Sequence, residues 1–267
     1  MRIGVFGAGG TVGKEVVRRV LATPGLVLAG GTSRPKSAVI GKDIAAVAGL
    51  KPIGMAISAD PAQVFAVSDV VIDFALSSAT LRHLKLAAKA KVPIVLGVTG
   101  FKAAHRSAIR LAAKRTAVVE APNTAYAVNL AMTYIERVAR ILAGDFDVEI
   151  VTIGDRKLPF APSGTALQLV DAAARGLGVK RDKALVKVRD GDIGVRKPTA
   201  IGLHNIRGGI RPGNSQRGVF FGDSEVIEIA GITSSPAIYA DGAVVAAQWV
   251  KGKRPGHYGM REVFDLG

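Results

Sequence analysis

The sequence predicts an α/β protein: a Rossmann-type, doubly wound parallel sheet joined to an α+β domain with a mixed or antiparallel sheet. Two observations support this prediction. Up to residue 120, short β-branched runs alternate with longer segments of helical periodicity, which is typical of parallel strands joined by crossover helices. Between residues 201 and 232, strand-like runs follow one another without a helix between them, which is typical of an antiparallel or mixed sheet.

The bulk composition indicates a globular protein of one or two domains. The chain has 267 residues, of which 49% are hydrophobic, so a sizeable core is possible. Cysteine is absent, which excludes disulfides and thiolate chemistry and fits a cytoplasmic location. No run of about 18 apolar residues predicts a membrane span, and Met1–Gly10 lacks the apolar segment of a signal peptide.

The chain is strongly basic, with a formal net charge of +15. Its Lys and Arg residues are scattered, and aromatic residues, which nucleic-acid sites interleave with basic ones, make up only 5%. We therefore expect acidic small-molecule ligands and neither a nucleic-acid nor a membrane partner.

A glycine-rich turn is the first motif that indicates function. A short apolar strand, Arg2–Phe6, runs into a G-x-x-G-x-x-G pattern, and a helix is expected from Lys14 to Leu21. Glycine allows a tight turn and a close approach of the backbone to a pyrophosphate, which the helix N-terminus attracts. The pattern predicts a dinucleotide site formed by Gly7, Gly10, Thr11, Val12 and Gly13.

The end of the second expected strand, Leu26–Thr32, predicts which dinucleotide is bound. Sites selective for NAD usually place Asp or Glu here for the ribose hydroxyls. In this chain the segment from Gly31 to Lys36 has no carboxylate. Ser33 and Arg34, with Lys36 as a further cation, are expected to hold a 2′-phosphate, so NADPH is preferred and NADH remains possible. The alternative is a solvated loop.

A second anion site is expected where a strand, Val148–Ile153, leads through a charged loop into a helix. Ser163 follows Pro162 and has the position of a helix N-cap. The backbone N–H groups of Ser163, Gly164 and Thr165 are then free at the positive end of the helix and suit a carboxylate or phosphate. An ordinary capped helix without a ligand is the alternative.

The order of elements divides the chain into two domains. Residues 1–126 and 237–267 are expected to form the dinucleotide-binding domain, because a final apolar helix after Ala237 returns to it. Residues 127–236 are expected to form a domain for substrate binding and oligomerisation.

Several stretches resemble the dihydrodipicolinate reductases, the reductases of the lysine pathway. Ala161–Ala166, after a strand that begins Asp-Val-Glu, is similar to the substrate-binding signature of that family. Further similar stretches, in the same order, are Gly7–Gly13, Val71–Phe74, Gly97–Phe101, Ala121–Asn123 with Val128–Asn129, and Met260–Leu266. The resemblance covers essentially the whole chain.

The resemblance implies an NAD(P)H-dependent oxidoreductase that transfers hydride to an imine-type or unsaturated, carboxylated substrate. It also implies a homotetramer or another homo-oligomer. Two turns correspond to the nicotinamide contacts of the family, with Gly97, Thr99, Pro122 and Asn123 as the contact residues. No metal site is expected.

The substrate loop departs from the family. There it begins with a His pair and carries a Lys, groups that bind the second carboxylate and supply a proton. An alignment without gaps places Gly154 and Asp155 at the His pair, Leu158 at the Lys and Phe160 at an Asp. Gly209–Gln216 also replaces a family motif, and Pro236 replaces a ligand-facing Arg.

These departures leave three hypotheses open. One is a reductase acting on something other than the usual dicarboxylate, since a buried dianion without cationic partners is costly. The others are a divergent 4-hydroxy-tetrahydrodipicolinate reductase and a catalytically inactive NADPH-binding protein. For the active forms, Asp155 and Lys157 are the candidate catalytic residues beside water, and Arg156 is a candidate anion contact. Each of the three is otherwise a solvated loop charge.

Overall fold

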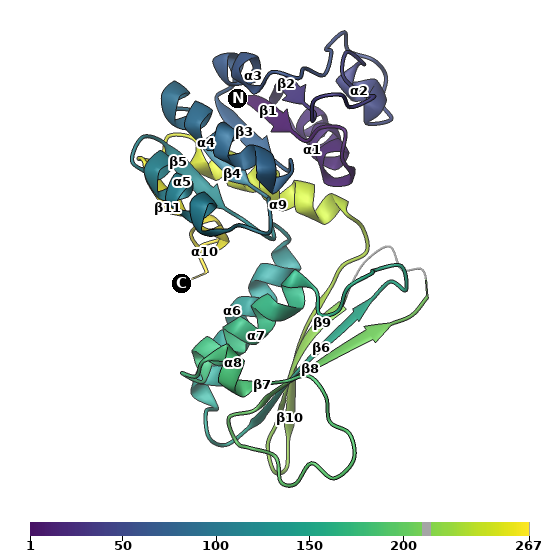
Figure 1. Ribbon diagram of the computed structural model, residues 1–267, viewed down its shortest axis with the longest axis vertical. Coiled ribbons are helices and arrows are strands. Elements are labelled where there is room, and N and C mark those ends of the chain that lie inside the picture. The colour runs from purple at the N-terminus through teal and green to yellow at the C-terminus, as the bar shows by residue number, and fades with distance from the viewer. Residues whose placement is uncertain (210–214, 267) are drawn as a thin grey trace. The chain divides into compact units, whose positions relative to one another are not determined.

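The computed structural model describes residues 1–209 and 215–266, and its contacts divide the chain into two compact units (Figure 1). Unit 1 comprises Met1–Ala125 and Pro236–Gly267, and unit 2 comprises Tyr126–Ser235. Each unit has its own sheet and its own hydrophobic core. No helix among the described residues is long and apolar enough to cross a membrane.

Unit 1 is built on a six-stranded sheet in which every neighbouring pair of strands is parallel. The strand order is β11-β5-β4-β3-β1-β2. The chain leaves β1 for β2 on one side and then returns to place β3 on the other, so the topological switch point lies between β1 and β3. Ligands bind at the carboxyl ends of strands at such a point. The strands are β1 (Arg2–Phe6), β2 (Val27–Thr32), β3 (Val70–Asp73), β4 (Ile94–Leu96), β5 (Ala117–Glu120) and β11 (Gly256–Tyr258).

Helices cover both faces of this sheet, as the alternation of side chains along β3 shows. Val70 and Ile72 share one core with α1 (Thr11–Ala22) and α9 (Ala237–Val250). Val71 points the other way, into a core with α4 (Ser77–Ala90) and α5 (Ala103–Ala113). Because successive strand residues face opposite sides, both faces are buried, and the predicted doubly wound parallel sheet is confirmed.

Four short elements of unit 1 were not predicted from the sequence. They are α2 (Ile44–Val47), α3 (Pro61–Val67), β11 and α10 (Met260–Val263). With three to seven residues each, they are too short to display a hydrophobic period. For α3 a local signal exists, since Asp60 caps the helix by accepting the N–H of Ala62 at 3.1 Å and Pro61 occupies its first position.

Unit 2 contains a five-stranded mixed sheet in the order β10-β9-β6-β8-β7. The central strand pairs in parallel with β8 and antiparallel with β9. This confirms the expected second sheet and resolves it as mixed. The strands are β6 (Asp147–Gly154), β7 (Leu185–Val186), β8 (Ile201–Arg207), β9 (Ser215–Phe221) and β10 (Val226–Ile232), and the helices are α6 (Tyr126–Ile141), α7 (Gly164–Gly176) and α8 (Arg181–Ala184).

The two long helices of unit 2 cover one face of its sheet. Along β6, Val148 and Ile150 are buried in a core with Ile135 of α6 and Leu169 of α7. The intervening Glu149 points to the opposite face, as the two-residue period of a strand requires. A carboxylate is therefore held in the middle of the sheet, where only 13% of its side chain is exposed.

Cationic side chains surround the Glu149 carboxylate. Arg189 donates two hydrogen bonds to it, of 2.8 and 2.9 Å, Arg196 lies 3.3 Å away, and the Nε2 of His204 lies 2.7 Å away. Burial alone would raise the pKa of Glu149, but the hydrogen bonds from Arg189 and His204 and the charges of Arg189 and Arg196 outweigh it and lower the pKa. The cluster ties the segment between β7 and β8 to β6.

Glu149→Gln is therefore expected to destabilise the protein by about 1–3 kcal/mol at neutral pH, because hydrogen bonds to a charged group are lost. A carboxyl whose pKa is lowered by folding contributes stability above its unfolded pKa and loses it as pH falls through the folded value. The difference from the parent protein should therefore shrink below about pH 4. Urea unfolding at the two pH values measures this.

Glu225→Gln is the matched control, since Glu225 is exposed and the same substitution there should change little. Equal unfolding free energies for the parent and Glu149→Gln at neutral pH would contradict the stabilising role of the cluster.

Candidate functional site

The glycine turn after β1 is shaped to receive a phosphate. Gly7 has a φ of +76°, and its carbonyl oxygen accepts the N–H of Gly10 at 2.9 Å. Gly10 is the N-cap of α1, and no side chain caps that end. The first N–H groups of a helix have no partner within it, so those of Thr11, Val12 and Gly13 are available to an anion.

Close packing in the turn depends on the absence of side chains. A Cβ atom at Gly13 would lie 2.0 Å from the carbonyl oxygen of Gly7, and one at Gly7 would lie 2.6 Å from that of Phe74. Glycine at both positions allows α1 to start directly beside the ends of β1 and β3. The turn therefore meets the requirement of a dinucleotide site that the backbone itself can approach the ligand.

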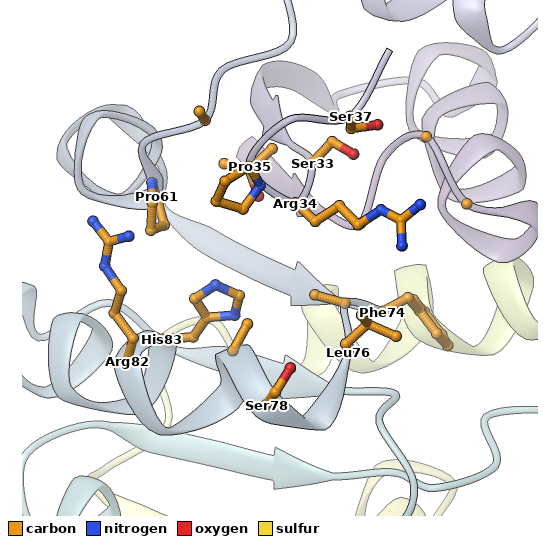
Figure 2. A pocket seen from close by; sticks show the side chains of 17 residues that line it. Ser33, Arg34, Pro35, Ser37, Pro61, Phe74, Leu76, Ser78, Arg82 and His83 are labelled. Carbon is orange, nitrogen blue, oxygen red and sulfur yellow. The ribbon is translucent and has the colours of Figure 1, made fainter. Parts of the chain in front are cut away.

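A cavity of about 570 Å³ opens beside this turn at the carboxyl ends of β1, β2 and β3 (Figure 2). This is the switch point where ligands are expected in such a sheet. Its walls are glycines of the turn, the segment after β2, Ala59 with Pro61, and the start of α4. The lining residues are Gly7, Gly9, Gly10, Thr32, Ser33, Arg34, Pro35, Ser37, Ala59, Pro61, Phe74, Ala75, Leu76, Ser78, Ala79, Arg82 and His83.

The segment after β2 brings hydroxyl and guanidinium groups to this cavity. Ser33 and Arg34 both line it, together with Ser37, and none of its lining residues is Asp or Glu. The N–H of Ser33 donates to the carbonyl oxygen of Ser58 at 3.2 Å, which fixes the backbone there. Lys36 is not among the lining residues and is exposed.

A buried ion pair fixes the opposite wall. Asp73 is fully buried and its Oδ2 lies 2.7 Å from the Nδ1 of His83, while its Oδ1 accepts the N–H of Ala75 at 2.8 Å. Asp73 therefore joins the end of β3 to α4 and has a structural role. It also holds the His83 ring against the cavity.

The expected nicotinamide contacts lie at the carboxyl ends of β4 and β5 and do not line the cavity. Gly97 is packed against the ring of Phe74, because a Cβ atom there would lie 2.2 Å from it. Asn123 is buried and accepts the N–H of Ala125 at 3.0 Å. Thr99 and Pro122 are exposed. These contacts stay a prediction.

In unit 2, the helix end expected to bind an anion has the predicted form. Ser163 is the N-cap of α7, and its Oγ accepts the N–H of Ala166 at 3.1 Å. Gly164 and Thr165 begin the 13-residue helix. No heavy atom lies within 4 Å of a Cβ built at Gly164, so the space beside its backbone is open. The N–H groups of this first turn can therefore receive a carboxylate.

The charged loop before α7 is held by backbone and side-chain hydrogen bonds. Asp155 closes a tight turn by accepting the N–H of Lys157 at 2.7 Å, and the N–H of Arg156 donates to Gly209 at 3.1 Å. Arg156 and Lys157 are exposed, Leu158 is half-buried, and Phe160 is 61% exposed. The structure therefore brings the three charged candidates together in one turn.

Arg207 is a loop contact that the sequence did not predict. It ends β8, beside Gly154 of β6, and donates a hydrogen bond of 3.2 Å to the carbonyl oxygen of Phe160. The pairing of β6 with β8 brings it to the loop, so no local sequence signal marks it. Within the segment Gly209–Gln216, residues 210–214 lie outside the described residues.

The described residues hold no group of three or more His, Asp or Glu side chains that could bind a metal ion. The candidate sites are therefore the glycine turn with its cavity in unit 1 and the start of α7 in unit 2.

Comparison with known proteins gives a consistent result over both units. Residues 1–124 match the family model described as dihydrodipicolinate reductase, N-terminus, and residues 127–264 match the model described as its C-terminus. The 4-hydroxy-tetrahydrodipicolinate reductase of Anaeromyxobacter dehalogenans is 41% identical and aligns over 99% of this chain and 98% of its own length. The enzyme of the same name from Magnetococcus marinus is 40% identical over 100% and 99%.

Solved structures agree on the fold. Dipicolinate-bound dihydrodipicolinate reductase from Paenisporosarcina sp. TG-14 is similar with a TM-score of 0.74, covers 98% of each chain and is 19% identical. An amine dehydrogenase from Mycobacterium smegmatis is similar with a TM-score of 0.65 and 14% identity, and the match covers 96% of this chain and 94% of that one. At these identities the likeness concerns the fold alone.

Proposed function

The chain belongs to the dihydrodipicolinate reductase family, and we propose that it reduces 4-hydroxy-tetrahydrodipicolinate with a preference for NADPH. Family membership makes the chain an NAD(P)H-dependent oxidoreductase that acts on a small molecule. The substrate is proposed on one main observation, the identity of 38–41% to curated enzymes of that name over 99–100% of the chain.

The glycine turn and the cavity of unit 1 fit a phosphorylated dinucleotide. The first turn of α1 would hold the pyrophosphate, since a side chain at Gly13 would fill the space that the backbone needs. Ser33 and Arg34 would hold the 2′-phosphate, because they line the cavity and no carboxylate does so. The bound cofactor would supply the hydride that reduces the substrate.

The start of α7 would bind one substrate carboxylate. The N–H groups of Gly164 and Thr165 belong to the first turn of a helix whose dipole favours negative charge, and Ser163 caps it with its side chain. This contact would fix the orientation of the substrate in unit 2. It is shared by a dicarboxylate and a monocarboxylate and does not discriminate between them.

Lys157 is the better candidate for the proton donor. The Asp155 side chain accepts a hydrogen bond from the loop backbone, which is a structural use of a carboxylate. The Lys157 ammonium is exposed and carries only donor hydrogens. We therefore propose that Lys157 donates the proton that accompanies hydride addition, and that Arg156 assists in holding an anion.

A second candidate substrate, an imine with a single carboxylate, is favoured by the composition of the loop. Leu158 and Phe160 present apolar side chains beside the start of α7, and Gly154 carries no side chain at all. A second carboxylate would then depend on Arg156, Lys157 or Arg207. Rates of NADPH oxidation with a dicarboxylate imine and with monocarboxylate imines decide between the two candidates. Activity with neither would favour a cofactor-binding protein without catalysis.

The assignment of the cofactor to unit 1 and the substrate to unit 2 is part of this proposal. The homotetramer implied by the family resemblance stays a prediction. The mass of the purified protein in solution, measured by light scattering, tests it.

A further inference from the structure

We infer that Arg82 of α4 contacts the adenine ring of the cofactor with the face of its guanidinium group, and that Asp60 holds the group in place. This inference rests on the proposed cofactor and adds a binding residue from the wall opposite Ser33 and Arg34. It divides the work of the two arginines in the cavity: Arg34 for the 2′-phosphate and Arg82 for the base.

The two arginines lie in different parts of the cavity. Figure 2 shows the guanidinium of Arg82 beside Pro61, whereas Ser33, Ser37 and Arg34 lie across the cavity from it. The walls on the side of Arg82 include small apolar groups, Ala59 with Pro61 and Ala79. A planar, largely apolar base suits that side, and a phosphate suits the side with hydroxyl groups.

Their ion pairing also differs. Arg82 donates from Nη2 to the Oδ1 of Asp60 at 3.3 Å, whereas no ion pair of Arg34 is found among residues 1–209 and 215–266. A carboxylate on the edge of Arg82 partly neutralises it for a phosphate, but leaves its planar face available for stacking. Guanidinium groups stack on aromatic rings in this way.

Asp60 is itself anchored, so it can set the position of Arg82. Its Oδ1 accepts the N–H of Ala62 and caps α3. The side chains of Arg82 and Asp60 are 62% and 43% exposed, and such an exposed pair adds little to folding stability. Removing the pair should therefore affect the ligand site and leave the fold intact.

The test compares the dissociation constants of NADPH, NADH and reduced nicotinamide mononucleotide, which lacks adenine. Arg82→Met should raise the constants of NADPH and NADH by the same factor, about 5- to 10-fold, as expected for a lost stacked cation. The mononucleotide should be unaffected. Arg82→Lys should resemble Arg82→Met, because it keeps the charge but lacks the plane. Asp60→Asn should have a smaller effect of the same kind.

Arg110→Met is the matched control, since Arg110 is an exposed arginine on α5 of the same unit and does not line the cavity. A loss confined to NADPH would overturn the inference by making Arg82 a phosphate ligand. Unchanged binding of both dinucleotides to Arg82→Met would overturn it as well. Failure of the parent protein to bind either dinucleotide would overturn the proposed cofactor itself, which is a distinguishable result.

Discussion

Gly13→Ala is expected to weaken NADPH binding by about 10- to 100-fold. The added Cβ atom would lie 2.0 Å from the carbonyl oxygen of Gly7 and 2.7 Å from its carbonyl carbon. Both are backbone atoms and cannot rotate away, so the turn and α1 must separate. Overpacking of this kind costs about 1–3 kcal/mol, and 1.4 kcal/mol corresponds to a factor of ten in affinity. The movement also takes the helix N–H groups away from the pyrophosphate.

Fluorescence titration with NADPH measures this effect, and circular dichroism with thermal unfolding separates it from loss of the fold. Gly208→Ala is the matched control, because no heavy atom lies within 4 Å of a Cβ built there. It should bind NADPH as the parent protein does. Unaltered affinity in a folded Gly13→Ala protein would show that the turn does not hold the pyrophosphate.

Ser33→Glu is expected to lower the ratio of NADPH to NADH affinity by at least about 10- to 100-fold, since a hydrogen bond to a charged group contributes about 1.5–3 kcal/mol. A carboxylate at the end of β2 would repel the 2′-phosphate and accept hydrogen bonds from the ribose hydroxyls of NADH. The Ser33 N–H is bonded to the Ser58 carbonyl oxygen, so the new side chain should extend from an unchanged backbone.

Lys36→Glu is the control for this variant, because it introduces the same acidic side chain in the same segment but outside the cavity lining. Its affinity ratio should stay close to that of the parent protein. If both variants shifted the ratio equally, the preference would come from the overall field and not from contact with Ser33.

The long elements were predictable because hydrophobic periodicity marks them. β6 follows from the β-branched run Val148–Ile153. β9 was expected only from Gly218, yet it begins at Ser215. Ser215 and Gln216 are polar but buried, and they take part in the sheet through pairing with Ile153 and Thr152 of β6. Nothing in the local sequence shows such long-range pairing.

The candidate sites were predictable where one continuous segment builds them. The glycine turn, Ser33 with Arg34, and the Ser163 cap are each local patterns. Arg82 is not, because it comes from a different helix and reaches the cavity only through the order of β1 and β3 in the sheet. Arg207 is likewise brought to the substrate loop by the pairing of β8 with β6.

The measurement that tests the central claim most directly is NADPH oxidation by the purified protein with 4-hydroxy-tetrahydrodipicolinate generated in situ. A curated family reductase serves as the reference. The proposed function predicts turnover at a comparable rate, and a fall of about 100-fold or more in kcat for Lys157→Met if Lys157 donates the proton. NADPH binding without turnover of this substrate would contradict the proposal and direct the search to imines with one carboxylate.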